Sequence, residues 1–583
     1  MSKNPRVTVE LTGAELVLRA LRDSGVRSVF GIPGGANLPL YESLGEASWL
    51  HHVLTRHEQG AGHAASGYAQ ATGRIGVCFA TSGPGATNLV TPLMDAHMDS
   101  VPVLAVTGQV DSAHLGSDAF QETDICSIVA PITKSAVEVT AAADVEDAIR
   151  DAIVEATTGR PGPVLVSITK DALSATTEAE TTRPRLVSPP PLAPDSAAVR
   201  RAAAVLLSSV RPLLYVGGGV VKSGAFEALA ELAELLHLPV VTTLMAQGAF
   251  PSGHVQHLGM PGMHGTVPAV AAMQRADLLV AIGTRFDDRV TGRLDGFAPA
   301  ARVIHIDIDQ RELSRKRRAD VAVHADCGLA LKALTQEVRA QLTGSARPDL
   351  DQWWHTITDW RERYPLGYPE GDSPLTATHV LRRLDAMATG PRTVFTVGVG
   401  QHQMWAAQLL TREQPRTFLT SGGAGTMGYA VPAALGAQVA RPDAEVWAID
   451  GDGCFLMTGQ ELSTCVHERL PVKVAVINNS TLGMVRQWQE LFFEGNVQHT
   501  DLDSPSEPTG PDITSLASAY GCAAQKVDRA EDVDRAILAA SAVQDRPAVI
   551  EFVVSKTEMV WPMVPAGASN EDIMTARGMR PTF

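Results

Sequence analysis

Cysteines are few in this sequence, and their spacing excludes the architectures that depend on them. The chain has six cysteines in 583 residues, and none belongs to a Cys-x-x-Cys pair. They also lie far apart in the sequence, so neither a disulfide framework nor a structural zinc site is indicated. We expect buried thiols in a reducing compartment, at Cys78, Cys126, Cys327, Cys454, Cys465 and Cys522.

Long apolar runs and an excess of positive charge are also missing. No run of 18 apolar residues could span a bilayer, and residues 1–5 lack the apolar core of a signal peptide. The net charge is -16, whereas a nucleic-acid-binding protein needs a basic face. We therefore expect a cytoplasmic protein with no organellar transit peptide and no binding to membranes or nucleic acids. Any phosphate group would be bound at a local site.

The chain is too long for a single hydrophobic core, since it has 583 residues. Two stretches have the composition of linkers: residues 174–195 are rich in Thr, Pro and Glu, and residues 344–374 begin in a Gly, Ser and Pro segment. They predict three domains, at residues 1–175, 195–345 and 375–583.

The first and third domains repeat one plan. Apolar residues at 76–80 lead through a glycine turn and a helical stretch to a second apolar strand at 101–107. The same sequence of strand, glycine turn, helix, proline and strand occurs at 446–479. This indicates a duplicated α/β unit, and the nearly continuous apolar strands are typical of a parallel sheet covered on both faces.

The middle domain also alternates strands with helices. Apolar strands at 212–220, 238–243, 276–283 and 301–309 end in glycines or carboxylates, where open α/β sheets bind ligands. A nucleotide cofactor would suit this domain, but without a complete Gly-x-Gly-x-x-Gly the glycines serve equally well as plain turns. The predicted fold class is α/β, with three doubly wound parallel-sheet domains.

Polar side chains follow two neighbouring strands of the third domain. Asp452 lies between Gly451 and Gly453, and the next strand ends in Asn478 and Asn479. Carboxylate and amide oxygens suit Mg²⁺, which takes its remaining ligands from phosphates and water. The helix after Gly453 would point its N-terminal amides at a diphosphate. The alternative is that the aspartate caps this helix and the asparagines form a turn.

This pair of motifs resembles the thiamine-diphosphate-binding motif. Six further stretches extend the resemblance over nearly the whole chain, to the catalytic large subunit of acetohydroxyacid synthase, also called acetolactate synthase. They are residues 56–65, 119–122, 283–289, 400–405, 421–429 and 482–488.

The resemblance implies roles for residues around thiamine diphosphate. Glu58 would relay a proton at the aminopyrimidine ring, and the small residues that follow it can exclude water. Met427 would wedge between the two rings and keep the coenzyme bent. The implied coenzyme contacts are Glu58, Val399, Gln401, His402, Met427, Gly451, Gly453 and Met484, and the Mg²⁺ ligands are Asp452, Asn479 and the backbone carbonyl of Thr481.

The resemblance also implies the reaction. Pyruvate loses carbon dioxide, and the hydroxyethyl carbanion that remains is joined to pyruvate or 2-oxobutyrate in branched-chain amino acid biosynthesis. Arg285 would bind the carboxylate of the acceptor, while Met484 and Trp488 would form the apolar wall beside it. The other implied residues at the substrate are Gly35, Phe120, Gln121 and Lys170.

The resemblance implies FAD in the middle domain. The flavin would be structural, because the reaction transfers no net electrons. Family members assemble each site from two chains, so we expect a homodimer or homotetramer, with a regulatory small subunit left open. The implied flavin contacts are Arg160, Gly217, Gly218, Gly219, Met260, Met263, His264, Gly265, Gly283, Arg285, Asp287, Arg289, Asp307 and Asp326.

The sequence departs from the family pattern after the tryptophan helix. Residues 493–513 lack the usual Arg-Tyr pair, and residues 126–130 are also unusual. These departures suit a paralogue of a specialised or inhibitor-resistant kind. The same fold would also suit a flavin-dependent pyruvate oxidase, a 2-oxo acid decarboxylase, or a catalytically silent scaffold that modulates an active homologue.

Overall fold

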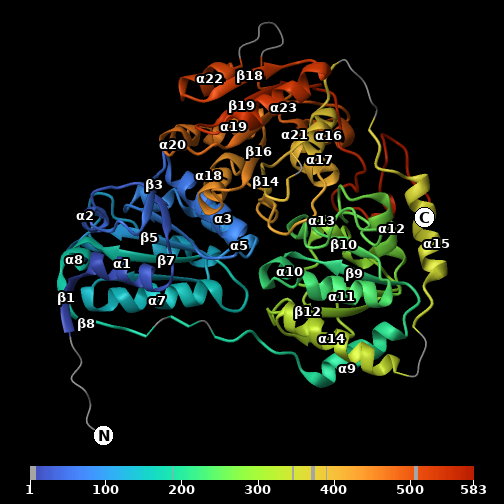
Figure 1. Cartoon of the computed structure of the whole chain (residues 1–583), viewed down its shortest axis with the longest axis horizontal. Coiled ribbons are helices and arrows are strands. Elements are labelled where there is room, and N and C mark those ends of the chain that lie inside the picture. Colours follow the sequence, from blue (N-terminus) through green and yellow to red (C-terminus); the bar gives the residue numbers. More distant parts are fainter. Residues whose placement is uncertain are drawn as a thin grey trace.

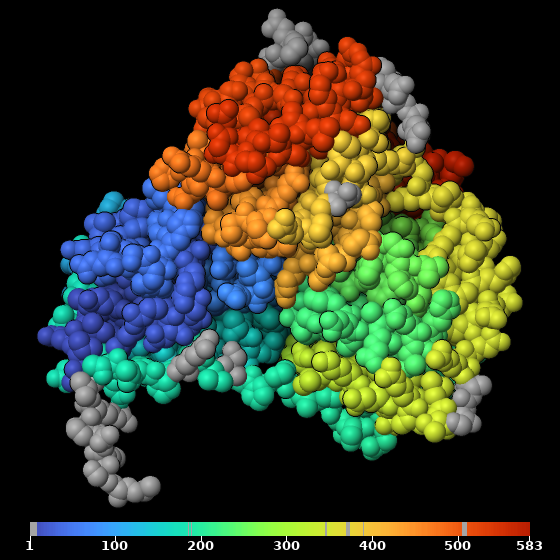
Figure 2. Space-filling view, viewed as in Figure 1, coloured from blue at the N-terminus to red at the C-terminus, as the bar shows by residue number. Residues whose placement is uncertain are grey.

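Each third of the chain is built around its own parallel β-sheet. The computed structural model describes residues 8–184, 186–187, 189–343, 347–368, 374–388, 390–503 and 510–583, so residues 1–5 considered above lie outside it. Figure 1 shows the first domain in blue to teal, the middle domain in green to yellow and the third in yellow-orange to red. In the space-filling view of Figure 2, the third domain borders both of the others.

The first domain has a six-stranded parallel sheet with the order β3-β2-β4-β5-β7-β6. Every residue of β4, β5 and β7 is buried, as expected where helices cover both faces. The strands are β2 Ser28–Gly31, β3 His51–Leu54, β4 Gly76–Ala80, β5 Val103–Gln109, β6 Ser135–Val139 and β7 Val164–Thr169. The helices are α1 Gly13–Asp23, α2 Leu38–Leu44, α3 Glu58–Thr72, α4 Pro84–Thr87, α5 Val90–Met98, α6 Ile125–Val129, α7 Ala142–Thr157 and α8 Lys170–Ser174.

The third domain repeats this sheet strand for strand, with the order β15-β14-β16-β17-β19-β18. When the strands are numbered within each sheet, both sheets have the order 2-1-3-4-6-5, which confirms the predicted duplication. The strands are β14 Thr393–Val397, β15 Phe418–Thr420, β16 Glu445–Gly451, β17 Lys473–Asn478, β18 Ala523–Val527 and β19 Ala548–Val553. The helices are α16 Ala377–Met387, α17 Gln401–Leu409, α18 Ala430–Ala440, α19 Asp452–Thr458, α20 Glu461–His467, α21 Gly483–Phe492, α22 Ile513–Ala519 and α23 Val533–Ala542.

The middle domain has a five-stranded parallel sheet with the order β10-β9-β11-β12-β13. The fold class predicted from the sequence is therefore confirmed in all three domains. The strands are β9 Pro212–Val216, β10 Val240–Thr242, β11 Leu278–Ile282, β12 Arg302–Asp307 and β13 Val321–His324. The helices are α9 Ser196–Leu207, α10 Gly218–Ser223, α11 Phe226–Leu236, α12 Val267–Arg275, α13 Asp288–Thr291, α14 Cys327–Leu342 and α15 Asp351–Arg363.

Three segments belong to the first or the middle domain although they lie outside the residue ranges predicted for those domains. The strand β8, Thr176–Glu180, pairs antiparallel with β1, Thr8–Thr12, and so continues the first domain. The helix α15 lies in the second predicted linker but packs on the middle domain, where Trp353 Nε1 donates to Pro212 O at 3.1 Å. The end of the chain also returns there, since the Val564 amide donates to Met263 O at 2.7 Å. The linker-like composition of a stretch gives no indication of such long-range contacts.

The first and third domains meet along α3 and α18, which are rich in small residues. A Cβ on Gly67 would lie 2.3 Å from Ala433 O, and one on Gly436 would lie 1.9 Å from Ala64 O. The two backbones therefore touch at positions where only glycine fits. The close contact between α3 and α18 fixes the relative position of the two chain segments that lead into these helices.

Two expectations about the whole chain concern its helices and thiols. Within the described residues, every helix is too short or too polar to span a bilayer. The six cysteines are free, and all except the half-buried Cys126 are buried.

Candidate active site

The carboxyl ends of β16 and β17 lie side by side, with Gly451 paired to Ile477. Asp452 follows Gly451 as the first residue of α19 and is 6% exposed. Burial raises the pKa of its carboxyl to about 7, against the backbone amides of Gly453 and Ser480, which favour the charged form. Among the described residues, no side-chain cation pairs with this carboxylate.

The turn after β17 presents Asn479 beside the same edge. Its Oδ1 accepts from the Thr481 amide at 3.1 Å, and its Nδ2 donates to Gln401 Oε1 at 3.3 Å. Asn478 instead contacts Glu551, to which its Nδ2 donates at 2.7 Å. A buried carboxylate and an amide at neighbouring strand ends provide hard oxygen atoms, the type of ligand that Mg²⁺ binds.

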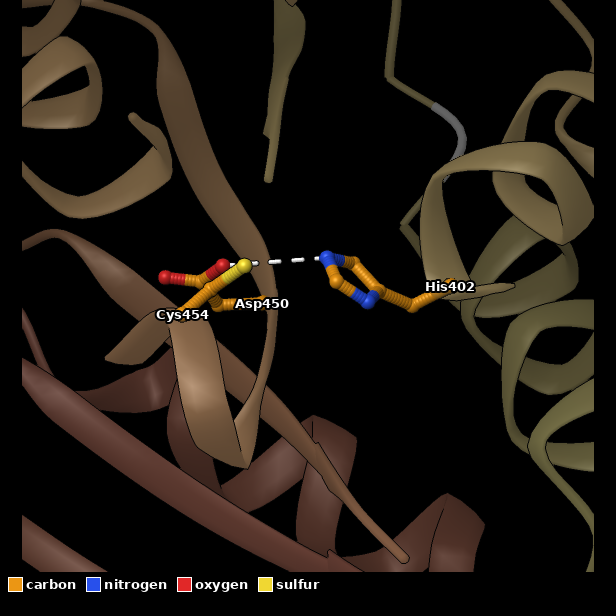
Figure 3. Close-up of side chains that lie close together, drawn as sticks. All are labelled: His402, Asp450 and Cys454. Atoms are coloured by element: carbon orange, nitrogen blue, oxygen red, sulfur yellow. Dashed lines mark ion pairs between the residues drawn. The ribbon is translucent and has the colours of Figure 1, made fainter. Parts of the chain in front are cut away.

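His402, Asp450 and Cys454 form a buried cluster at the carboxyl end of β16 (Figure 3). The His402 Nε2 lies 3.7 Å from Asp450 Oδ1, and Cys454 Sγ donates to Val399 O at 3.0 Å. Burial lowers the pKa of His402 to about 3, so its ring is neutral at pH 7, and burial also raises the pKa of Asp450 well above its ordinary value. The 3.7 Å separation is thus not an ion pair.

Glycines leave the space that His402 occupies. A Cβ on Gly451 would lie 2.9 Å from His402 Nδ1, and one on Gly398 would lie 2.0 Å from Asp450 Oδ1. Gly451 therefore has a packing role against the histidine, which adds to the turn that the sequence predicts. Gly453 approaches Leu482, Leu502 and the end of the half-buried Met427, whose Cε would be 3.5 Å from an added Cβ.

A cavity of about 680 Å³ lies where the three domains meet. Its wall includes every residue predicted for the flavin except Gly265. Val399, Met484 and Trp488 from the third domain line the same cavity, whereas Gln401, His402 and Met427 are not among its lining residues. The structure thus brings the predicted flavin residues together with part of the predicted coenzyme pocket.

Several cavity residues are committed to local contacts. Arg160 donates to Glu312 Oε1 at 3.1 Å and to Ser100 Oγ at 2.8 Å, and so joins the first domain to the middle one. Asp326 caps α14 through the Leu329 amide at 3.0 Å. Burial raises the pKa of Asp307 to about 6.

The glycine turn after β9 lies against a second glycine. A Cβ on Gly217 would be 2.3 Å from Gly283 O, and one on Gly219 would be 2.6 Å from Gly283 Cα. The two turns leave bare backbone at the cavity wall, which suits close approach by a diphosphate.

The end of the cavity near the third domain combines a cation with apolar surface. An added Cβ on Gly423 would lie 3.3 Å from Arg285 Nη2, so this guanidinium lies against the loop that leads to Met427. Arg285 Nη2 lies 3.6 Å from Asp287 Oδ2. The Arg289 guanidinium lies 5.9 Å from the centre of the Trp488 ring.

The predicted residues of the first domain lie elsewhere. Glu58 begins α3 half-buried, and Asn88 Nδ2 donates to its Oε2 at 2.8 Å. Phe120 is 87% exposed. Gln121 has φ 62°, and Gly35 and Lys170 are exposed. None of these five is among the described residues that line the cavity.

Sequence reasoning missed part of the cavity wall. Residues 189–192, read as a linker, line it together with Asp99, Lys222 and Met245. Their composition carries no signal for a site, because a proline-rich connection is equally typical of a free linker. The unusual segment 493–513 includes residues 504–509, which lie outside the described chain, and its Phe493 is 63% exposed.

Comparison with known proteins defines the class. The thiamine pyrophosphate enzyme models match the chain in order: the N-terminal TPP binding domain over residues 11–128, the central domain over 199–334 and the C-terminal TPP binding domain over 398–552. The three parallel-sheet domains of the structure correspond in order to these three models, so the chain is a thiamine pyrophosphate enzyme.

Full-length relatives narrow the class. The acetolactate synthase large subunit of Mycobacterium tuberculosis is 54% identical over 581 residues, which cover 98% of this chain and 93% of the relative. That of Corynebacterium glutamicum is 51% identical over 576 residues, 98% and 91% of the two chains. Acetolactate synthase 2 of Nicotiana tabacum is 42% identical over 577 residues, 98% and 86%. The chain belongs to the acetolactate synthase large-subunit family of thiamine pyrophosphate enzymes, as the resemblance predicts.

Proposed function

We propose that the protein is the catalytic subunit that decarboxylates pyruvate and joins the remaining two-carbon unit to a second 2-oxo acid. The products would be 2-acetolactate from pyruvate and 2-aceto-2-hydroxybutyrate from 2-oxobutyrate, both precursors of branched-chain amino acids. The observation that carries this proposal is the cavity that joins the flavin residues to Arg285 and Trp488, beside the paired tips of β16 and β17.

Three residues of the third domain would hold Mg²⁺ and, through it, the diphosphate of thiamine diphosphate. They are Asp452, Asn479 and the backbone carbonyl of Thr481. The buried carboxylate of Asp452 supports this assignment, because it has no cationic side chain beside it among the described residues. When bound, thiamine diphosphate would supply a nucleophilic carbon for the pyruvate carbonyl and a positively charged thiazolium ring that takes up the electron pair released with carbon dioxide.

Glu58 would hold and return the proton that the aminopyrimidine ring exchanges. Its Oε2 is held by Asn88 at 2.8 Å, and an added Cβ on Gly85 would lie 3.3 Å from Oε1. A carboxyl group fixed through one oxygen can transfer a proton along a set direction through the other.

Arg285 would bind the carboxylate of the acceptor, with Met484 and Trp488 excluding water beside it. A cation at an apolar wall both orients a 2-oxo acid and favours its attack over protonation by water. Lys170, Gln121, Phe120 and Gly35 would approach this pocket from a second copy of the chain, so the working unit would be at least a homodimer. The 87% exposure of the Phe120 ring supports this arrangement.

FAD would occupy the larger part of the cavity in a structural role. The bare backbone at Gly217, Gly219 and Gly283 supports a diphosphate there, and a volume of about 680 Å³ is in the range of sites for large ligands. The relatives named as large subunits support a small regulatory subunit as a further partner.

The test is acetolactate formation from pyruvate with thiamine diphosphate, Mg²⁺ and FAD. We expect the wild type to form acetolactate, Glu58→Gln to lose on the order of a hundredfold or more in rate, and the exposed control Glu227→Gln to match the wild type. Bleaching of the bound flavin by pyruvate without acetolactate would instead identify an oxidase. Equal rates for Glu58→Gln and wild type would contradict the role of Glu58.

A further inference from the structure

A buried carboxylate of the third domain holds the backbone that leads to Glu58. Glu461, at the start of α20, is 0% exposed. Its Oε1 accepts from the amides of Arg56 and His57, both at 3.0 Å, and its Oε2 accepts from Thr464 Oγ1 at 3.0 Å. Glu58 is the next residue after this pair of amides. The position of α3 is therefore set by a side chain some 405 residues away in the sequence.

The first domain holds the loop that leads to Met427 in the same way. Asp99, just after α5, is 5% exposed and accepts from the amides of Gly422 and Gly423, each at 2.8 Å. Asp95, within α5, accepts from Ser421 Oγ and, at 3.1 Å, from Thr426 Oγ1. Met427 follows at once, before α18 begins.

These two contacts are equivalent under the duplication. The strands β3 and β15 hold the same place in the two sheets, and each leads through a clamped loop into the interface helix, α3 or α18. The helices α5 and α20, which carry or adjoin the acidic residues, each precede the fourth strand of their sheet. Each of these two domains therefore supplies a carboxylate that accepts hydrogen bonds from a loop of the other.

Stabilisation of the contact between the first and third domains does not by itself explain why these buried residues are acidic. Burial raises the pKa of Glu461 to about 7 and of Asp95 to about 8, so the chain loses stability by burying acids where apolar side chains would pack. Glu461 and Asp99 each accept from two backbone amides, which hold the main chain itself in place. A role in fixing the position of the loops explains both why the acids are buried and why they accept hydrogen bonds from backbone amides.

We propose that Glu461 and Asp99 are positioning residues that hold Glu58 and Met427, each acting on the other domain's coenzyme-contacting loop. The inference rests on the proposed roles of Glu58 and Met427. Asp95 supports the second clamp through the two hydroxyl groups that its Oδ1 accepts from. Loss of either clamp lets the loop shift while both domains keep their folds.

The experiment measures how fast the thiazolium C2 proton exchanges for deuterium in the enzyme loaded with thiamine diphosphate and Mg²⁺. The exchange is stopped with acid and followed by NMR. The affinity for the coenzyme is measured separately by tryptophan fluorescence. Glu461→Leu removes both acceptors, and Asp99→Asn puts an amide donor against one of two backbone donors. We expect both to slow exchange on the order of tenfold to a hundredfold, since small misplacements of reacting groups have effects of this size. Pyruvate KM should change less than kcat.

Matched variants separate positioning from general damage. Glu461→Gln keeps an oxygen that can accept from the amides of both Arg56 and His57, and Asp95→Asn keeps the oxygen that accepts from both hydroxyl groups. Exchange should therefore stay within about threefold of wild type. Asp151→Asn, on an exposed position of α7, should have no effect. If Glu461→Leu does not fold, Asp99→Asn and Thr464→Val decide the matter, because both conserve shape.

Folded Asp99→Asn and Glu461→Leu that exchange at the wild-type rate would overturn the proposal. Exchange needs no substrate, so the proposal and the proposed function fail separately. Wild type that exchanges the proton but forms no acetolactate would refute the function and leave the clamps intact. If Glu58→Gln exchanged as fast as wild type while Glu461→Leu was slow, Glu461 would not act through Glu58.

Discussion

Buried histidines in this protein are held neutral, and His63 in α3 shows the reason most simply. It is 0% exposed, neither ring nitrogen has a hydrogen-bond partner within the part of the chain that the structure describes, and burial lowers its pKa to about 3. Asp95 lies 3.9 Å away and burial raises the pKa of that acid to about 8, so at pH 7 the two do not form an ion pair. Tyr429 packs edge-on against the ring.

His63 should make the protein sensitive to acid. Its folded pKa lies below the ordinary 6.5, so the neutral ring costs nothing above pH 6.5, and stability is lost as the pH falls below that value. At pH 5.5 this loss amounts to about 1.4 kcal/mol. We expect His63→Gln to lose less Tm than wild type between pH 7 and pH 5.5, measured by differential scanning fluorimetry.

The control is His355→Gln, at an exposed position of α15. It should follow the wild-type dependence of Tm on pH. An identical dependence for His63→Gln and wild type would contradict a neutral buried His63.

At the scale of elements, the crossing of α3 and α18 depends on glycine. Gly436→Ala would place a methyl group 1.9 Å from Ala64 O, which forces the helices apart. We expect a loss of about 1–3 kcal/mol in the free energy of unfolding, the usual range for overpacking, seen as a lower Tm. Thiamine diphosphate affinity should fall as well, because both clamped loops enter these helices.

Gly45→Ala serves as the matched control. Gly45 has a helical φ of -57°, and an added Cβ would meet only Glu42 O at 3.3 Å among the described atoms. Its Tm should stay close to that of wild type or rise slightly. A Gly436→Ala variant as stable as Gly45→Ala would show that α3 and α18 separate without cost.

At the scale of the whole molecule, the proposed site draws Glu58 from one chain and Asp452 from another. Mixing inactive Glu58→Gln with inactive Asp452→Asn would then yield hybrid dimers with one intact site. Random exchange of subunits predicts about a quarter of the wild-type acetolactate rate. The measurement is activity after the variants are mixed and allowed to exchange subunits, with each variant alone as control. Activity that stays at the level of the single variants after proven exchange would place both residues in one chain's site.

Local patterns in the sequence predicted much of this architecture. Apolar strands ending in glycines and carboxylates identified β16, β17 and most strands of the middle domain, because burial on both faces leaves a continuous apolar run. Repetition of the plan predicted two like sheets, and both have the same strand order. The side chains at the tips of β16 and β17 followed from the parallel pairing.

Several features had no local signal. The helix α15 and the strand β8 lie in stretches with linker composition, and residues 189–192 line the cavity although they are read as a connection. In the sequence, nothing distinguishes the acidic residues Asp95, Asp99 and Glu461 from polar residues of exposed helices. Their roles depend on partners more than 300 positions away.

The sequence by itself determined the strands, the glycine turns, the duplication and the family, because each depends on residue types at short, regular spacing. Only the tertiary structure decided which acids are buried, which loops they hold and which segments close the cavity. Those outcomes depend on how three parallel sheets and their helices pack together. Helix contacts such as that of α3 with α18 are set by shape across the domain border rather than by any local pattern.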